Sequence, residues 1–249
     1  MKKARTIFLV LSCLLPAGCR PENSENLVIA AAANTRFAME ELVAAFSRET
    51  GIMCETIFAS SGKLTVQIRQ GAPFDVFIAA DMNYPEKLFR EGFSKKPPRL
   101  YAYGKLVLWS SDTSRLLAGK NVNHIALANP RTAPYGQAAV EALKSFALYK
   151  AVESKLVYGE SISEVNHFII SGTAEMGFTS LSSVMAGEMK GKGQWILIDT
   201  ASYSRLTQGA VLLKRSKRRP QAQRFYDFLL SHKGKQILRE FGYKVNQND

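Results

Sequence analysis

The feature that most constrains the fold of this chain is a regular alternation of short apolar runs and amphipathic helical stretches between residues 27 and 81. The run LVIAAAA at 27–33 is apolar throughout, which is typical of a parallel strand that is buried on both faces. Apolar residues then recur at helical spacing up to Gly51, and the runs ETIFAS and DVFIAAD flank a second helical stretch. This β-α-β-α-β order predicts an α/β fold with a parallel sheet and right-handed crossovers.

The alternation restarts beyond Tyr103, and neither a linker nor a repeat separates the two parts. Further strands are predicted by the runs KLVLWSS, HIALANP, KLVYGES, AEMGFTS and WILID. Helical spacing is clearest in YGQAAVEALKSFAL and SEVNHFII, and a last strand, GAVLLK, precedes two terminal helices. A restart without a linker favours two lobes that share crossing strands over two tethered domains.

The N-terminal residues have the pattern of a targeting segment. MKKAR is positive, IFLVLSCLL is apolar but too short to span a bilayer, and PAGC supplies small residues, so residues 1–19 are predicted to be a signal peptide. Cys19 resembles the lipid-bearing cysteine of bacterial lipoproteins, although Pro16 stands where such signals usually have Leu. We expect lipid on Cys19, a tether over residues 20–26, and a periplasmic or cell-surface protein anchored to the membrane.

The formal net charge is +12, and it falls to +9 (12 − 3) when Lys2, Lys3 and Arg5 leave with the signal peptide. The basic residues are mostly scattered, and the densest run, KRSKRRP at 214–220, is interpreted as a polar turn before a helix. Since no segment interleaves basic and aromatic residues, the sequence does not favour a nucleic-acid partner.

Cysteine and histidine usage offers neither a disulfide framework nor a metal site. Only Cys54 lies in the predicted mature body, so no internal disulfide is expected. His124, His167 and His232 are far apart and lack the spacing of metal ligands, so no zinc site is expected.

Short polar side chains stand where two of the predicted strands end. Asn34 follows the first strand as a candidate helix cap, and Ser60 and Ser61 follow the second. Ligands of open parallel sheets bind beyond the carboxyl ends of the strands, and helix N-termini favour anions. These junctions therefore predict an anion site, although any one of them alone is equally typical of a plain helix cap.

Ser60 and Lys63 also form the S-x-x-K pattern of an acyl-transferring serine. The companion S-D-N and K-T-G motifs are absent from the chain. A secreted serine acyl-transferase is therefore the remote alternative, and we expect no enzyme activity and no catalytic residue. Lys63 is expected to be exposed, and Ser60 to support the turn.

Longer segments of the sequence resemble those of a known family. The segments AAAANTRFAMEELVAAFSRETG, IFASSGKLTVQIRQGAPFDVFIAAD and QGAVLLKRSK resemble the molybdate-binding proteins of bacterial ABC uptake systems, the ModA family, and the similarity runs from about Leu27 to Tyr243. The resemblance implies a two-lobed periplasmic-binding-protein (type II) fold, with a parallel-rich sheet in each lobe and crossing strands. It also implies that 27–101 plus 204–249 form lobe 1 and that 105–203 form lobe 2.

The resemblance further implies a set of residues that bind the anion. The family's serine at the second strand falls on Ser61, and its first-helix position falls on Asn34, whose side chain and backbone N–H are both expected donors. Two later positions fall on Tyr135 and on Ile162, of which Ile162 offers only its backbone N–H. Some members carry a tyrosine ligand where this chain has Ser180, so Ser180 is not included and the Tyr135 hydroxyl is expected to replace that ligand.

Such a site consists of hydrogen-bond donors only, which suits a fully ionised dianion. Phosphate keeps a proton near neutral pH and would favour a carboxylate acceptor, whereas sulfate differs mainly in size. We therefore expect a monomeric binding protein without a cofactor that captures molybdate or tungstate and delivers it to the membrane permease of an ABC transporter. The alternative is a binding protein of the same fold for another oxyanion, such as sulfate or phosphate.

Overall fold

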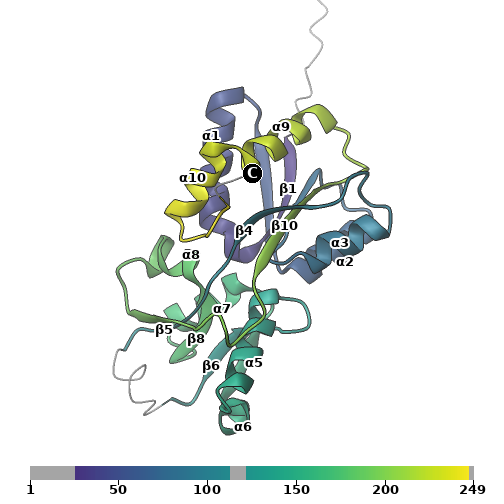
Figure 1. Cartoon of the computed structure of the whole chain (residues 1–249). Coiled ribbons are helices and arrows are strands. Elements are labelled where there is room, and N and C mark those ends of the chain that lie inside the picture. Colours follow the sequence, from purple (N-terminus) through teal and green to yellow (C-terminus); the bar gives the residue numbers. More distant parts are fainter. Residues whose placement is uncertain (1–25, 113–121, 247–249) are drawn as a thin grey trace, which may run out of the picture.

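The computed structural model of the chain describes residues 26–112 and 122–246. Two five-stranded sheets, with strand orders β2-β1-β3-β10-β4 and β7-β6-β8-β5-β9, form two lobes that lie one above the other in Figure 1. We call the lobe with β1 lobe 1 and the lobe with β5 lobe 2. Within the described residues, no helix has the length and apolar character needed to cross a membrane.

Lobe 1 is built on a mixed sheet. β1 pairs in parallel with β2 and β3, whereas β10 runs antiparallel to β3 and β4. Its strands are β1 (Leu27–Ala32), β2 (Cys54–Ala59), β3 (Val76–Ile78), β4 (Arg99–Tyr103) and β10 (Thr207–Leu212). Its helices are η1 (Ala33–Thr35), α1 (Arg36–Thr50), α2 (Ser61–Arg69), α3 (Asn83–Arg90), α9 (Arg219–Leu230) and α10 (His232–Glu240).

Lobe 2 repeats the mixed arrangement. β6 pairs in parallel with β7 and β8, whereas β5 runs antiparallel to β8 and β9. Its strands are β5 (Leu106–Ser110), β6 (Ile125–Ala128), β7 (Leu156–Gly159), β8 (Met176–Ser180) and β9 (Gln194–Leu197). Its helices are α5 (Pro134–Ser145), α6 (Tyr149–Val152), η2 (Glu153–Lys155), α7 (Ile162–Ile170), α8 (Leu181–Val184) and η3 (Gly187–Met189).

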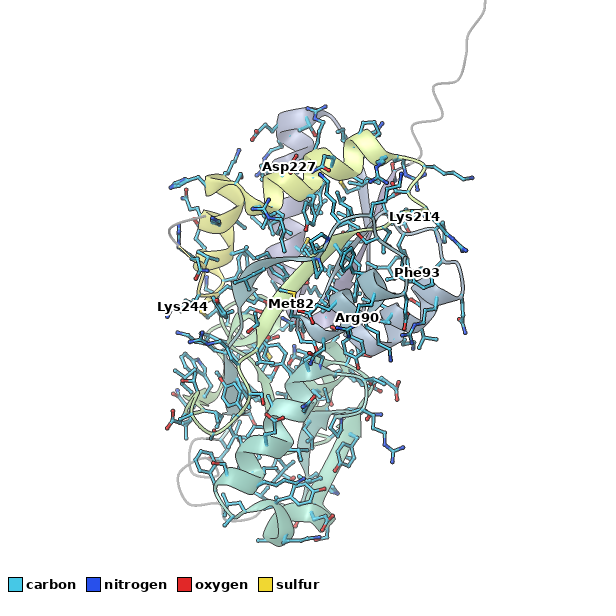
Figure 2. The ribbon with its side chains drawn as sticks, turned by 45° about the vertical axis from the view of Figure 1, so that its right-hand side comes forward. Met82, Arg90, Phe93, Lys214, Asp227 and Lys244 are labelled. Atoms are coloured by element: carbon cyan, nitrogen blue, oxygen red, sulfur yellow. The ribbon has the colours of Figure 1, made fainter. Side chains whose placement is uncertain are left out.

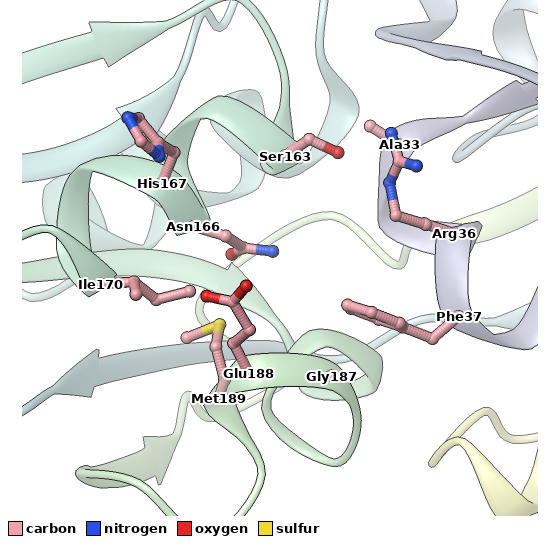
Figure 3. Close-up of a pocket in the computed structure, with 10 residues that line it drawn as sticks. All are labelled: Ala33, Arg36, Phe37, Ser163, Asn166, His167, Ile170, Gly187, Glu188 and Met189. Carbon is pink, nitrogen blue, oxygen red and sulfur yellow. The ribbon is translucent and has the colours of Figure 1, made fainter.

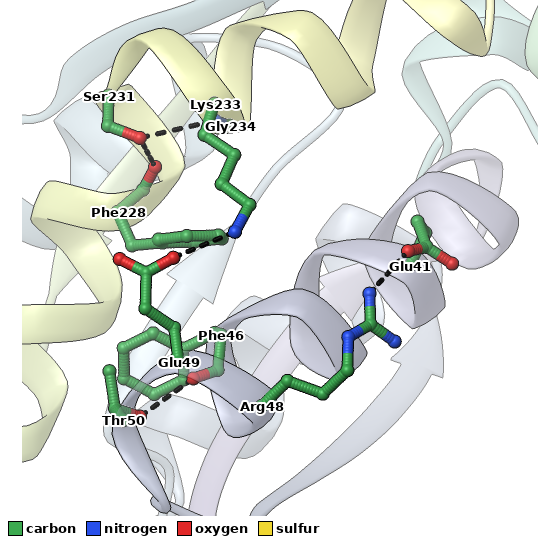
Figure 4. Close-up of polar contacts among 9 residues, drawn as sticks. All are labelled: Glu41, Phe46, Arg48, Glu49, Thr50, Phe228, Ser231, Lys233 and Gly234. Carbon is green, nitrogen blue, oxygen red and sulfur yellow. Dashed lines mark hydrogen bonds and ion pairs between the residues drawn. The ribbon is translucent and has the colours of Figure 1, made fainter.

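The C-terminal helices cover α1 on one side of lobe 1, and their contacts are both apolar and polar (Figure 4). The Phe46 ring packs against the rings of Phe225 and Phe228, with centroids 5.3 Å and 5.6 Å away. Beside the Phe228 ring, Lys233 Nζ lies 2.8 Å from a Glu49 carboxylate oxygen. The terminal segment therefore returns to the first helix of the chain and completes the core of lobe 1.

The chain passes between the sheets twice, once between Tyr103 and Leu106 and once between Leu197 and Thr207. The strands that come directly after these passages, β5 and β10, are the ones that run antiparallel, which is why each sheet is mixed rather than purely parallel. The lobe boundaries given from the sequence stay predictions. The predicted signal peptide lies outside the described residues, as does all of the tether except Asn26.

Several elements differ from the sequence-based expectation. Asn34 does not cap α1, because it lies inside the 3₁₀ turn η1 and its side chain makes no cap hydrogen bond. Helix α3 and strand β4 are not predicted by the sequence pattern, since α3 buries only Pro85 and Leu88 and so lacks a long apolar stripe. Tertiary packing rather than local pattern determines such short elements.

The run KRSKRRP does form a turn before a helix, as interpreted, but one of its arginines is bound in the interior. Arg218 Nε lies 3.0 Å from the carboxylate of Asp75, which is 1% exposed. The same carboxylate accepts hydrogen bonds from the Val28 N–H at 2.8 Å and the Ser216 hydroxyl at 2.7 Å. One buried carboxylate thus joins the start of β1, the start of β3 and the turn before α9.

We expect Asp75→Asn to lower the free energy of unfolding by about 3 kcal/mol, because it removes the buried negative charge beside the Arg218 guanidinium. Urea unfolding measures this difference. Glu49→Gln is a matched control that breaks the exposed Glu49–Lys233 pair, and it should cost less than about 1 kcal/mol. Equal losses in the two variants would contradict the role assigned to Asp75.

Candidate anion-binding site

A small cavity lies between the lobes, where β1 and β2 end and where α5 and α7 begin. It encloses about 10 Å³, which is near the minimum that holds one water molecule. Its lining residues are Ala32, Ala33, Asn34, Ser60, Ser61, Ala80, Ala133, Pro134, Tyr135 and Ile162. The structure thus brings the four positions that the sequence singled out, Asn34, Ser61, Tyr135 and Ile162, into one cavity.

The backbone geometry around this cavity favours an anion. Ser61 and Ile162 are the first residues of α2 and α7, and Tyr135 is the second residue of α5. The first N–H groups of a helix have no acceptor within it, and the helix dipole adds positive potential at the same end. Several helix N-termini therefore meet at one point, where a negative group would find several donors.

The two serines at the start of α2 differ in their partners. Ser61 Oγ accepts a hydrogen bond from the Ala80 N–H at 3.0 Å, so its own hydrogen stays available for a ligand. Ser60 is the N-cap residue, yet its hydroxyl makes no cap hydrogen bond. The buried Ser60 Oγ has no partner among the described residues. The Ser60 side chain therefore does not make the hydrogen bond that its expected role in supporting the turn requires. Its hydroxyl lies beside the cavity as a second candidate donor, which the sequence did not single out as a ligand.

The Asn34 side chain is not free to donate. Its amide nitrogen donates to Gln208 Oε1 at 3.1 Å and to the Tyr243 hydroxyl at 3.0 Å, which uses both of its hydrogens. Its backbone carbonyl accepts from Ser182 Oγ of lobe 2 at 2.6 Å. Of the two donors expected at this position, only the backbone N–H therefore remains for a ligand.

Tyr135 is held with its hydroxyl in the interior between the lobes. Gln208 Nε2 donates to this hydroxyl at 3.3 Å, and Gly104 leaves the space it occupies, since a Cβ there would come 2.2 Å from the oxygen. Burial raises the pKa of Tyr135 well above its usual value, with the nearby Tyr243 and Tyr203 as lesser causes. The hydroxyl therefore keeps its proton and can act as a donor.

Ser180 has a structural role. Its hydroxyl caps helix α8 by accepting a hydrogen bond from the Ser183 N–H at 3.2 Å, and it also contacts the Ser183 hydroxyl at 2.8 Å. Ser180 does not line the cavity. Leaving it out of the ligand set agrees with this geometry.

The arrangement around Ser60 does not resemble a serine nucleophile. Such a nucleophile needs a hydrogen bond to an adjacent base. Ser60 Oγ makes none within the described chain, and Lys63 is exposed and does not line the cavity. The S-x-x-K pattern thus arises by chance at the start of a helix and does not mark a nucleophile.

A larger cavity of about 330 Å³ lies beside the small one and shares Ala33 with it. Figure 3 shows Arg36 and Phe37 of α1 on one side, and Ser163 of α7 and Glu188 of η3 across from them. The Glu188 carboxylate would repel a dianion, whereas no acidic residue lines the small cavity. The small cavity is therefore the better candidate for an anion site.

Asp81 is the ionisable residue next to the lining residue Ala80, and burial raises the pKa of its carboxyl to about 6. In the unfolded chain an Asp carboxyl has a pKa of about 3.9. Between these values the folded protein binds more protons than the unfolded chain. The free energy of unfolding should therefore fall as the pH rises from about 4 to about 6.

Asp81→Asn removes this titration and keeps a side-chain acceptor for the Tyr84 N–H, which lies 3.3 Å from the Asp81 carboxylate. We expect the variant to be more stable than the parent by roughly 1–3 kcal/mol at pH 8 and to match it near pH 4. Urea unfolding at both pH values measures the two differences. A stability difference that does not change with pH would show that the Asp81 charge is not the cause.

The sequence profile of the bacterial extracellular solute-binding protein family matches residues 27–244. The chain belongs to this family. It is 40% identical to the molybdate-binding protein ModA of Azotobacter vinelandii over 223 residues, which cover 86% of this chain and 88% of that protein. It is 36% identical to the molybdate-binding protein ModA of Rhodobacter capsulatus over 246 residues, which cover 96% of this chain and 94% of that protein.

The solved structure of the periplasmic molybdate-binding protein of Azotobacter vinelandii is also similar. The TM-score is 0.84 at 31% identity, and the match covers 89% of this chain and 100% of that chain. The two-lobed α/β fold and the resemblance to the ModA proteins, both predicted from the sequence, are thereby confirmed. This solute-binding protein thus belongs with binding proteins rather than with enzymes.

Proposed function

We propose that this solute-binding protein captures molybdate or tungstate outside the cytoplasm and delivers it to the membrane permease of an ABC transporter. The observation that carries the proposal is a cavity between the lobes with hydroxyl and N–H donors and no acidic residue in its lining. The ModA relatives at 36–40% identity support the choice of ligand.

The chemistry of the ligand fits such a lining. Molybdate and tungstate are tetrahedral dianions whose oxygens only accept hydrogen bonds. Donors for them are the hydroxyls of Ser61 and Tyr135 and the backbone N–H groups of Asn34, Ser61, Tyr135 and Ile162. A carboxylate acceptor, which a protonated phosphate would favour, is absent from the lining.

The enclosed space is smaller than a tetrahedral oxyanion, since about 10 Å³ admits little more than one water. Binding therefore needs the lobes to separate slightly and to close again over the ligand, as in a hinged clamp. We propose that the two passages of the chain between the sheets are the hinge. A disulfide between two introduced cysteines that fixed the lobes in the present arrangement should block molybdate binding. Unimpaired binding by the cross-linked protein would exclude this motion.

Calorimetric titration of the mature chain with molybdate, tungstate, sulfate and phosphate tests the function. We expect one molybdate or tungstate to bind per chain, and both to bind more tightly than the other two anions. Tighter binding of sulfate or phosphate would favour the alternative ligand class. If none of the four anions gave a binding heat, an oxyanion-binding role would be rejected.

We expect Ser61→Ala to weaken molybdate binding by about 10- to 100-fold, because a hydrogen bond to a charged group contributes roughly 1.5–3 kcal/mol. Lys63→Ala is the matched control in the same first turn of α2, and its exposed ammonium adds only a screened attraction. The effect of Lys63→Ala should fade as salt rises, whereas the effect of Ser61→Ala should persist. A larger effect of Lys63→Ala in high salt would make Lys63 a direct ligand and the neutral-donor site wrong.

Ser60→Ala tests whether the neighbouring hydroxyl also binds the anion. The Ser60 hydroxyl has no partner among the described residues and can donate to the same anion, so its removal should also weaken molybdate binding, by about tenfold. A role in the turn alone predicts a lower free energy of unfolding with unchanged affinity. Titration and urea unfolding of this variant distinguish the two roles.

We propose that Cys19 is the first residue of the mature chain and carries lipid, which anchors the protein beside its transporter. The small residues before Cys19 support this, and Pro16 departs from the usual signal. Two or more acyl chains would hold the protein stably, at about 0.8 kcal/mol per buried CH₂ group. Mass spectrometry of the mature N-terminus decides this, and an unmodified start at Arg20 would exclude the anchor.

A further inference from the structure

One edge of lobe 1 carries a dense set of basic side chains. They come from three segments, namely the loop before β4 with the first residue of that strand, the loop after β10, and the first turns of α9. We call this set the basic face, and its members are Lys95, Lys96, Arg99, Lys214, Arg215, Lys217, Arg219 and Arg224. Arg219 is half-buried, and the others are exposed.

Backbone and side-chain contacts hold the three segments together. The Lys214 N–H donates to the Phe93 carbonyl at 2.7 Å, and Figure 2 shows these two residues near each other on lobe 1. Lys96 and Arg99 share a hollow of about 150 Å³ with Gln223 of α9. The basic face is therefore one continuous surface.

Acidic groups compensate little of this charge. Asp75 forms an ion pair with Arg218, and Glu91 forms one with Arg69. Asp227 lies in the hollow beside Lys96. No ion pair involves a member of the basic face within residues 26–112 and 122–246. The surface thus carries a net positive charge, with Asp227 as the acidic residue in its hollow.

The basic face is not part of the anion site. β4 runs in the same direction as β1, because β3 is parallel to β1 while β3 and β4 are both antiparallel to β10. The start of β4 and the end of β10 therefore share an edge of the sheet with the start of β1. The anion cavity is at the other end of β1, and the six residues of this strand span about 20 Å. This distance exceeds the physiological Debye length of about 8 Å, so the basic face adds little to anion binding.

Strand β1 begins beside the basic face, and the proposed lipid on Cys19 would attach the chain to the membrane near this point. Val28, near the start of β1, and Ser216, in the loop after β10, both donate to the Asp75 carboxylate, at 2.8 Å and 2.7 Å. Figure 1 shows the start of β1 near α9 on the same side of lobe 1. Only seven residues (26 − 19) lead from Cys19 to Asn26, a reach of at most about 25 Å.

We propose that the basic face docks on the anionic phospholipid headgroups of the membrane surface. Basic clusters next to a membrane attachment point are attracted to anionic lipids, by roughly fivefold in affinity for each lysine or arginine that reaches the surface. The proposal does not depend on which anion the cavity binds.

The test is co-sedimentation of the lipid-free mature chain, residues 20–249, with vesicles. Vesicles that contain phosphatidylglycerol should bind the chain at low salt and release it as salt rises, whereas vesicles of phosphatidylcholine alone should not bind it. The quadruple variant Lys95→Gln, Lys96→Gln, Lys214→Gln, Lys217→Gln should bind about 600-fold more weakly, at about fivefold for each lysine removed.

A matched control separates the basic face from net charge. The variant Lys144→Gln, Lys150→Gln, Lys190→Gln, Lys192→Gln removes the same charge from exposed sites on lobe 2 and should keep the affinity for the vesicles. Oxyanion titration and urea unfolding should be unchanged in both variants, which checks their folding. Equal loss in both variants would reduce the effect to net charge and overturn the proposal. Failure of the parent chain to bind phosphatidylglycerol would overturn it too, and would direct attention to an acidic protein surface instead.

Discussion

The arrangement of the two lobes depends on one buried amide, that of Gln208 on β10. Its side-chain oxygen accepts from the Tyr101 hydroxyl at 2.6 Å and from Asn34 Nδ2 at 3.1 Å, and its nitrogen donates to Tyr135 in lobe 2. A buried amide is costly unless its hydrogen bonds are made, so these contacts stabilise the present arrangement of the lobes. The same contacts hold Asn34 and Tyr135 in the lining of the candidate anion cavity, so this part of the core also shapes that cavity.

This junction is also electrically neutral. The hydroxyl of Tyr243 connects Asn34 of lobe 1 with Ser182 of lobe 2, and burial raises the pKa of Tyr243 to about 12. Hydrogen bonds between neutral groups are insensitive to salt, whereas exposed charges are screened by it. Around Gln208 and Tyr243 the two lobes therefore meet through neutral dipoles rather than through ion pairs. The contacts between the lobes and the electrostatics of the surface can respond to ionic strength independently of each other.

The sequence was sufficient for most of the regular elements, although not for α3 and β4. The uniformly apolar LVIAAA run of β1 and the helical spacing that ends at Gly51, whose φ is 73°, are direct results of burial on two faces and of the glycine C-cap. The family resemblance named four residues that do line one cavity, although they are spread over more than half of the chain. Local pattern and overall fold agree in these places, which is typical of natural sequences.

The features that the sequence missed depend on contacts between distant residues. The amide of Asn34 was expected to face a ligand, yet both of its hydrogens are taken by residues near the other end of the chain. The unpartnered hydroxyl of Ser60 and the buried pair of Asp75 with Arg218 are likewise invisible to any local pattern. Gln208 and Tyr243, which bind Asn34, and Arg218, which binds Asp75, lie more than 140 positions away along the chain, and only the folded chain brings them together.

The start of α7 illustrates the consequence of building a site out of main-chain groups. Ile162 is buried, lines the cavity and is the first residue of α7, so valine or leucine there would keep the same backbone N–H. Evolution can therefore exchange side chains around such a site while the recognition itself persists. Substitutions at these positions then reflect changes in the packing of the core. The percentage of identical residues between relatives therefore underestimates how well the chemistry of the site is preserved.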